Sequence, residues 1–262
     1  MIIALAASLG CLACVAAPSQ AIVGGHDTAP GAYPQVAEIT FGKSFLCSGT
    51  VIAPDWVLTA GHCGSVTGAA VASPAGWPAA LIDVRVGSNR SGQGTLVPAD
   101  KVVVEPVYLA TSGHDISLIH LASNAPVTPT RVAGPSEGSL WTAGTPEAIV
   151  GWGTTSEGGD LPDTLQEASV PVTTDAYCGG AYSDFDATTM VCAGYSQGGT
   201  DTCQGDSGGP LFGHTATGEL KVVGATSYGD GCARPGKPGV YARVADTELR
   251  EWIRSVAPAG VD

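Results

Sequence analysis

Short apolar runs separated by glycines and polar turns most limit the folds open to this chain. Many of the runs are rich in Val and Ile, and the 262 residues include 37 glycines and 18 prolines. Such runs are typical of the strands of a sandwich or a barrel. They are Gln35–Phe41, Thr50–Ile52, Trp56–Thr59, Leu81–Val86, Val102–Val104, Ile116–Leu121, Ala148–Gly151, Ala168–Val172, Leu211–Phe212, Lys221–Thr226 and Gly239–Val244. The sequence therefore predicts an all-β protein.

One late segment has helical spacing instead. Leu249, Trp252, Ile253 and Val256 recur every three or four residues, and Asp246 or Thr247 can cap the helix that they predict. No period of 20–50 residues repeats along the chain, which excludes a solenoid or a propeller.

The charge balance is strongly acidic, with a formal net charge of −13 and only 11 Lys and Arg residues. No basic run is present to neutralise phosphates, so the composition argues against nucleic acid as a partner. An acidic surface attracts cationic substrates, and salt weakens this attraction.

The N-terminus is typical of a secretion signal. Residues 1–17 carry no charged side chain and are mostly apolar. This segment is shorter than a typical transmembrane helix. It lies where a signal peptide has its apolar region. No Lys or Arg precedes it, so either the start lies upstream or the α-amino charge serves alone. We expect residues 1–21 to be a signal peptide with a possible short propeptide. We also expect the protein to be secreted and not to bind a membrane. A lipid anchor on Cys11 or Cys14 is the alternative, although neither follows a convincing Leu-small-small pattern.

Beyond the signal, the number of cysteines is even, which in a secreted protein predicts a disulfide framework. Six cysteines permit about 15 pairings, and spacing alone does not choose between them. A zinc site is the competing interpretation, but the mature chain contains neither C-x-x-C nor H-E-x-x-H. The cysteines are Cys47, Cys63, Cys178, Cys192, Cys203 and Cys232.

The run Cys203–Pro210 puts Ser207 on a turn crowded with glycines. A serine hydroxyl is a poor nucleophile alone, so the chemistry needs a general base and a group that orients the base. Both candidates lie upstream. His62 stands in Leu-Thr-Ala-Gly-His-Cys, and Asp115 stands in His-Asp-Ile-Ser-Leu-Ile.

These three contexts, in the order His, Asp, Ser, resemble the trypsin/chymotrypsin family of serine proteases. Over residues 22–257 the resemblance implies two six-stranded antiparallel β-barrels, at about 22–138 and 139–245, followed by a C-terminal α-helix. It implies a serine endopeptidase in which His62, Asp115 and Ser207 form the catalytic triad. No metal or organic cofactor is expected. The implied protein is a monomer whose partners are polypeptide substrates and protein protease inhibitors.

The resemblance also assigns the oxyanion hole and the activation step. The backbone N–H groups of Gly205 and Ser207 would hold the oxyanion. Ile22 would be the mature N-terminus, and its α-amino group would pair with Asp206. Ala21 stands where animal zymogens carry Arg or Lys. Signal peptidase can release Ile22 directly, or a second protease can remove a short propeptide, 18–21; both routes stay open.

The specificity pocket follows from the same resemblance. Asp201 matches the floor position, where an acid would pair with a substrate Arg or Lys. Gly229 and Gly239 match the walls, and Ser227 and Tyr228 lie on the strand that would bind the substrate backbone. Tyr228 replaces the more usual Trp, so the family implies no preference beyond the first subsite.

The family pattern also selects one disulfide pairing. It implies Cys47–Cys63, Cys178–Cys192 and Cys203–Cys232.

Two other functions remain as alternatives. One is a non-catalytic binding protein on this fold, although such relatives usually lose a triad residue and this chain has all three. The other keeps the enzyme but masks Asp201, so that the pocket prefers apolar or aromatic side chains. Substrate profiling distinguishes an enzyme that cleaves after Arg or Lys from one that prefers apolar or aromatic side chains. Labelling by a serine-reactive phosphonate distinguishes either enzyme from the non-catalytic binding protein.

Overall fold

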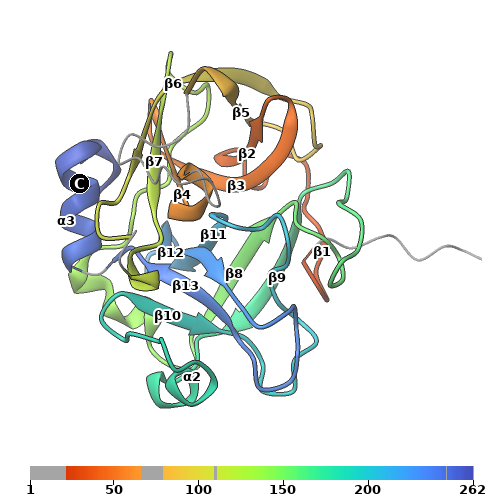
Figure 1. Cartoon of the computed structure of the whole chain (residues 1–262), viewed down its shortest axis with the longest axis vertical. Helices are drawn as coiled ribbons and strands as arrows, with labels where there is room; N and C mark the ends of the chain where they lie inside the picture. The colour runs from red at the N-terminus through yellow and green to blue at the C-terminus, as the bar shows by residue number, and fades with distance from the viewer. Residues whose placement is uncertain (1–21, 66–78, 109–110, 246, 262) are drawn as a thin grey trace, which may run out of the picture.

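Two antiparallel sheets form the body of the protein, one above the other in Figure 1. The structure is a computed structural model that describes residues 22–65, 79–108, 111–245 and 247–261. The predicted signal peptide and propeptide, Cys11, Cys14 and the capping candidate Asp246 lie outside the described residues. The all-β class predicted from the sequence is confirmed.

The first sheet is a closed six-stranded barrel in the order β2-β3-β4-β7-β6-β5. Alternation is clearest in β5, where Ile82, Val84 and Val86 are buried and the residues between them are half-buried. Because successive strand residues face opposite sides, this pattern turns the apolar set into the barrel. The strands are β2 (Val36–Phe41), β3 (Ser44–Ala53), β4 (Trp56–Thr59), β5 (Ile82–Val86), β6 (Thr95–Val104) and β7 (Ser117–Leu121).

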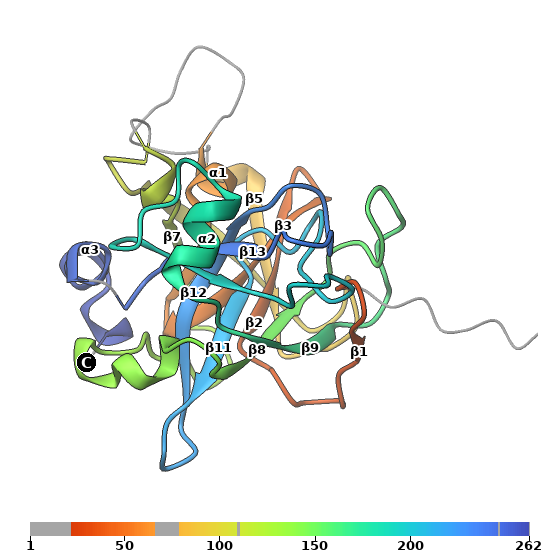
Figure 2. The same ribbon diagram turned by 90° about the horizontal axis from the view of Figure 1, so that it is seen from below.

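The second sheet has seven strands in the order β1-β9-β8-β11-β12-β13-β10, which differs from the six-stranded barrel implied by the family. The isolated bridge Val172–Ala193 joins the end of β9 to β10 and completes the ring. The extra strand is β1, which pairs with β9 although it precedes the whole first barrel (Figure 2). The strands are β1 (His26–Asp27), β8 (Pro146–Gly151), β9 (Gln166–Pro171), β10 (Met190–Ala193), β11 (Pro210–His214), β12 (Leu220–Tyr228) and β13 (Gly239–Arg243).

Helices are few and short. Leu249 and Ile253 of the last helix are fully buried, which confirms the helical spacing read from the sequence. Within the described part of the chain, no helix has the length and apolar character needed to cross a membrane. The α-helices are α1 (Gly61–Gly64), α2 (Asp175–Ala181) and α3 (Thr247–Val256), and the 3-10 helices are η1 (Ala79–Leu81), η2 (Ser112–His114), η3 (Pro135–Trp141) and η4 (Pro258–Gly260).

A single apolar cluster joins the two sheets and α3. It contains Ile52 and Leu58 from the first barrel, Val150 and Phe212 from the second sheet, and Ile253 from α3, all almost fully buried. Burying apolar side chains is the main favourable contribution to folding. The helix therefore packs on the cluster shared by both sheets, and the junction of the sheets, where the site lies, is held by core packing.

Six cysteines among the described residues form three disulfides. The pairs are Cys47–Cys63, Cys178–Cys192 and Cys203–Cys232. This is the pairing that the family resemblance implies.

Glu147 of β8 is a buried carboxylate that the sequence did not single out. It is 2% exposed, and neither of its side-chain oxygens has a hydrogen-bond partner among the described residues. It lies beside Gly213 of β11, where an added Cβ would stand 2.6 Å from Oε2. Burial raises the pKa of Glu147 from 4.5 to about 8.

The pH dependence of stability tests this environment. The folded state holds the Glu147 proton more tightly than the unfolded state, so its contribution is complete below pH 4.5 and is lost as the pH rises through about 8. We expect Glu147→Gln, made in a Ser207→Ala background, to raise the free energy of unfolding by about 1–3 kcal/mol at pH 8–9 relative to its effect at pH 5. Urea unfolding at both pH values measures this. Glu251→Gln in the exposed face of α3 is the control, and an equal effect of Glu147→Gln at both pH values would contradict the assignment.

Candidate active site

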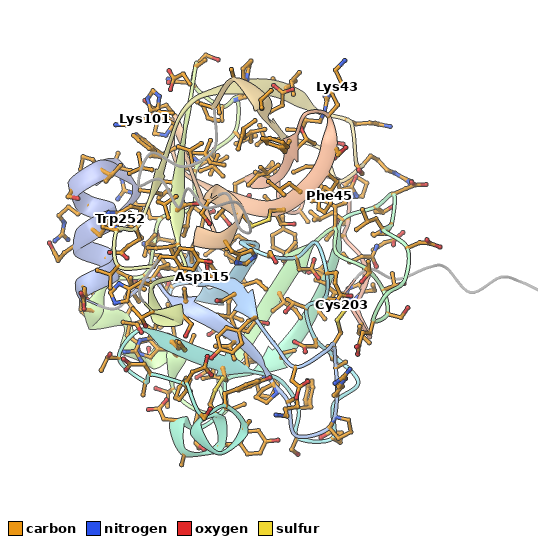
Figure 3. The ribbon with its side chains drawn as sticks, in the orientation of Figure 1. Lys43, Phe45, Lys101, Asp115, Cys203 and Trp252 are labelled. Atoms are coloured by element: carbon orange, nitrogen blue, oxygen red, sulfur yellow. A yellow bond between two sulfur atoms is a disulfide. The ribbon has the colours of Figure 1, made fainter. Side chains whose placement is uncertain are left out.

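The structure brings His62 and Asp115 together at the junction of the two sheets. His62 lies in α1, directly after β4, and Asp115 lies two residues before β7. Asp115 is 4% exposed and is labelled near the centre of Figure 3. Its Oδ2 lies 2.9 Å from His62 Nδ1, and its Oδ1 accepts a hydrogen bond of 2.8 Å from the His62 backbone N–H. Because a carboxylate only accepts, Nδ1 carries the proton and Nε2 is left as a lone-pair acceptor.

A third donor reaches Asp115 from the other sheet. Ser227 Oγ, on β12, donates to Asp115 Oδ2 at 2.5 Å. The sequence predicted Ser227 only as part of the substrate-binding strand, so its bond to Asp115 was missed. This bond ties the orienting carboxylate of the first barrel to the second sheet.

The environment favours the protonated form of His62. Burial on its own would lower the pKa of the imidazole, but the hydrogen bond and the charge of Asp115 outweigh burial and raise the pKa above its ordinary value. The ring is thereby suited to accept a proton and later return it.

Ser207 lies on a tight turn directly before β11. The backbone N–H of Asp206 donates to Cys203 O at 3.0 Å, and that of Gly208 donates to Thr226 O at 2.8 Å. In contrast, the N–H groups of Gly205 and Ser207 donate to no acceptor among the described residues. Gly205 has φ +100°, a conformation that side chains rarely adopt, and a Cβ there would stand 2.8 Å from Phe45 Cε1. The turn thus presents two backbone donors that the fold leaves unused.

Ser48 of β3 holds this turn from the first barrel. Its backbone N–H donates to Ser207 O at 3.0 Å, and its Oγ donates to Gly205 O at 3.1 Å. Sequence reasoning missed Ser48, because a serine beside a cysteine in a strand carries no distinctive signal. Only the approach of the two sheets gives it this role.

A cavity of about 210 Å³ opens beside Ser207. Asp201 lies in its lining and is 4% exposed; Oδ1 accepts from the Thr202 N–H at 2.9 Å, and Oδ2 accepts from the Ala233 N–H at 3.0 Å. Burial raises the pKa of Asp201 to about 6, although these two bonds lower it. The lining also includes Ser227, Tyr228, Gly229 and Gly239, so the cavity gathers every residue predicted for the specificity pocket.

Gly239 leaves Asp201 accessible. A Cβ at this position would stand 2.6 Å from Asp201 Oδ1, closer than real Cβ atoms come, and 3.0 Å from Tyr241 Oη, which is also a tight contact. At Gly229 the same atom would meet Gly231 O at 3.4 Å, which is ordinary contact. Of the two predicted wall glycines, Gly239 is the one whose missing side chain keeps the carboxylate open.

Comparison with known proteins agrees with this geometry. A family model described as Trypsin matches residues 22–253. The chain belongs to the trypsin family. It is 42% identical over 229 residues to a protein named Trypsin from Saccharopolyspora erythraea, covering 85% of this chain and 93% of that protein. It is 36% identical over 247 residues to Trypsin-1 of Astacus astacus, covering 90% of this chain and all of that protein. The chain is therefore a trypsin-like serine endopeptidase, which is a hydrolase.

In this member of the trypsin family, Asp206 and Ile22 are both fully buried. Asp206 Oδ1 accepts from the Gly153 N–H at 2.7 Å, and Oδ2 accepts from the Cys203 N–H at 2.8 Å. Burial raises the pKa of Asp206 to about 7, although the two bonds lower it. Ile22 packs in the apolar interior of the second sheet. A carboxylate this deep is stabilised when a cation comes close.

The described residues contain one group of three potential metal ligands, Cys47, His62 and Cys63, with ligand atoms within 4.8 Å of one another. Both sulfurs belong to one disulfide, so they offer no thiolate to a metal.

Turnover tests the tight turn before Ser207. We expect Gly205→Ala to lower kcat on a chromogenic peptide amide by about 10²-fold or more, because its Cβ would displace the backbone donors. Gly236→Ala is the matched control: it also has positive φ, but an added Cβ would meet nothing within 4 Å. If both substitutions reduce kcat equally, backbone strain and not the position of Gly205 explains the loss.

Proposed function

We propose that this chain is a secreted serine endopeptidase that cleaves peptide bonds after Arg or Lys through a Ser-His-Asp triad. The observation that carries the proposal is the buried Asp201 carboxylate in the cavity beside Ser207. The trypsin names of its relatives agree with such a preference.

The chemistry follows from the hydrogen bonds around Asp115. Ser207 Oγ attacks the peptide carbonyl carbon while His62 Nε2 takes the hydroxyl proton, and Asp115 stabilises the imidazolium. The oxyanion accepts hydrogen bonds from the free N–H groups of Gly205 and Ser207. His62 then gives its proton to the leaving amine, which breaks the peptide bond and leaves an ester on Ser207. Water, deprotonated by His62, hydrolyses this ester and restores the serine.

Charge explains the proposed preference for a basic side chain. The carboxylate of Asp201 has a raised pKa, and its donors are all neutral: the backbone N–H groups of Thr202 and Ala233 and the Thr202 hydroxyl. A guanidinium or ammonium brought into the cavity would stabilise the ionised form, and a neutral side chain would leave a buried charge unpaired. Gly239 leaves the space that a long side chain needs to reach the carboxylate.

Two features support secretion: the apolar N-terminal segment and the disulfides. Residues 1–17 are mostly apolar and carry no charged side chain, which is typical of the apolar region of a signal peptide. The three disulfides fit an oxidising compartment, because thiols are kept reduced in the cytosol of most organisms.

Hydrolysis of matched Arg, Lys, Phe and Ala chromogenic amides tests the function, with Ser207→Ala as the blank. We expect Arg and Lys amides to be cleaved and Ser207→Ala to remove turnover. Replacing Asp201 with Asn removes the charge at similar size and is expected to lower kcat/KM for Arg by about 10²–10⁴-fold, the loss of a buried charge pair.

The same panel distinguishes the alternatives. A preference for Phe or Ala that Asp201→Asn leaves unchanged would be consistent with catalysis by the triad. It would reject the proposal that Asp201 selects Arg or Lys. No turnover by a protein with a verified Ile22 terminus, together with no phosphonate labelling, would favour the non-catalytic binding protein.

Activation is proposed to depend on the free amino group of Ile22. An ammonium beside the buried Asp206 would provide the cation that its two backbone donors do not. Since Asp206 shares the turn of Gly205 and Ser207, this ion pair would fix the backbone donors.

Proteins that differ only at the N-terminus test this step. We expect a protein that begins at Ile22 to be active, and one that keeps residues 18–21 to lose about 10²-fold or more in kcat/KM, in line with a buried pair of about 3–5 kcal/mol. Asp206→Asn in the mature form should lower activity similarly. Full activity of the extended form, with its N-terminus checked by mass spectrometry after the assay, would reject the ion pair.

A further inference from the structure

Tyr228 links the pocket to a carboxylate outside it. Tyr228 ends β12 and lines the cavity beside Ser207. Its ring packs edge-on against Tyr182, with centroids 5.5 Å apart, and its hydroxyl donates to Asp184 Oδ1 at 3.2 Å. Burial and the charge of Asp184 raise the pKa of Tyr228 far above its ordinary value, so the phenol remains a donor. The ring therefore forms a fixed wall whose outer end carries Asp184.

Asp184 is also held from the first barrel. Its Oδ2 accepts from Ser112 Oγ at 3.3 Å, and Ser112 lies in η2, three residues before Asp115. The carboxylate is exposed, lies in the segment between α2 and β10, and joins the end of β12 to the segment that leads into Asp115. It thus has a fixed position on the rim of the site.

The charge of Asp184 has no cationic partner in the described part of the chain. Its two donors are neutral hydroxyls, and it forms no ion pair with Lys, Arg or His among the described residues. Other acids near the pocket are paired: Glu157 lies 2.6 Å from Arg234, and Asp230 lies 3.1 Å from Lys237. Of these three carboxylates, only Asp184 is available to a cation on the substrate.

An extended substrate that adds to the end of β12 passes this carboxylate. Pairing with a strand extends the peptide at about 3.3 Å per residue. Residues that precede the cleaved bond and pair with this end of β12 would then run from the cavity along Tyr228, whose hydroxyl contacts Asp184.

We propose that Asp184 is a specificity-determining residue that favours substrates with Arg or Lys two to four residues before the cleaved bond. This inference rests on the proposed function, since it assumes cleavage after Arg or Lys. The substrate class is then a peptide with two basic residues near the cut, one in the pocket and one at Asp184. Such a charge pair is exposed, so its effect is modest and falls with salt.

Chromogenic peptides that end in Arg test the inference. Pairs of peptides carry Arg or Gln at the second, third or fourth residue before the bond, and the initial rate of chromophore release reports only the bond after the last Arg. We expect kcat/KM to be about 2–5-fold higher with Arg at one or more of these positions. The ratio should fall to about 1 in Asp184→Asn and approach 1 for the native enzyme in about 0.5 M salt.

Asp100→Asn, which removes one charge from β6 of the first barrel, is the control and should keep the ratio. Equal rates for all pairs, a ratio that survives Asp184→Asn, or an equal loss in Asp100→Asn would overturn the inference while leaving cleavage after Arg intact. If Asp184→Asn fails to fold, the salt series on the native enzyme decides the question, because a ratio that persists at high salt would also overturn the inference. No chromophore release from any peptide would overturn the proposed function and this inference with it.

Discussion

The two sheets pack against each other through a shared apolar cluster, and residues of the candidate site come from both sides of this contact. His62 and Asp115 belong to the first barrel, whereas Ser207, Ser227 and Asp201 belong to the second sheet. The apolar cluster shared by both sheets fixes their distance. Polar links also cross the junction; among them, Ser227 donates to Asp115, and Ser48 holds the turn of Ser207. Because the centre consists of halves from separate sheets, a change in their packing alters the chemistry even when no reacting residue is replaced.

Buried carboxylates differ in this protein by what surrounds them. Asp115 accepts three hydrogen bonds, two of them from His62. Asp201 and Asp206 each have one backbone donor per oxygen and a raised pKa, and Glu147 has no donor among the described residues. A buried negative charge without a cation is unfavourable. On the proposed function, substrate supplies the cation for Asp201 and the mature N-terminus supplies it for Asp206. For Glu147, in contrast, burial raises the pKa to about 8, which favours the neutral carboxyl.

Much of the fold could be predicted from the sequence because strands carry a local apolar signal. Each of the eleven predicted runs lies in or overlaps a strand of the structure. The two strands that were missed depend on distant partners. β1 has two residues and forms against β9, and β10 is set by pairing with β13. Helix α2 contains two glycines, which disfavour a helix; it is held by the Thr174 cap and by the Cys178–Cys192 disulfide.

The fold class could be predicted from apolar runs along the chain, and His62, Asp115, Ser207 and Asp201 could be predicted from the short motifs in which they stand. The contacts between those motifs became visible only in the folded protein. It gave Ser227 a bond to Asp115, brought Ser48 against the turn of Ser207, and placed Asp184 at the hydroxyl of Tyr228. Each of these contacts joins residues far apart in the chain, and a hydrogen bond depends on distance and direction in space. Sequence motifs specify neither until the two sheets have packed.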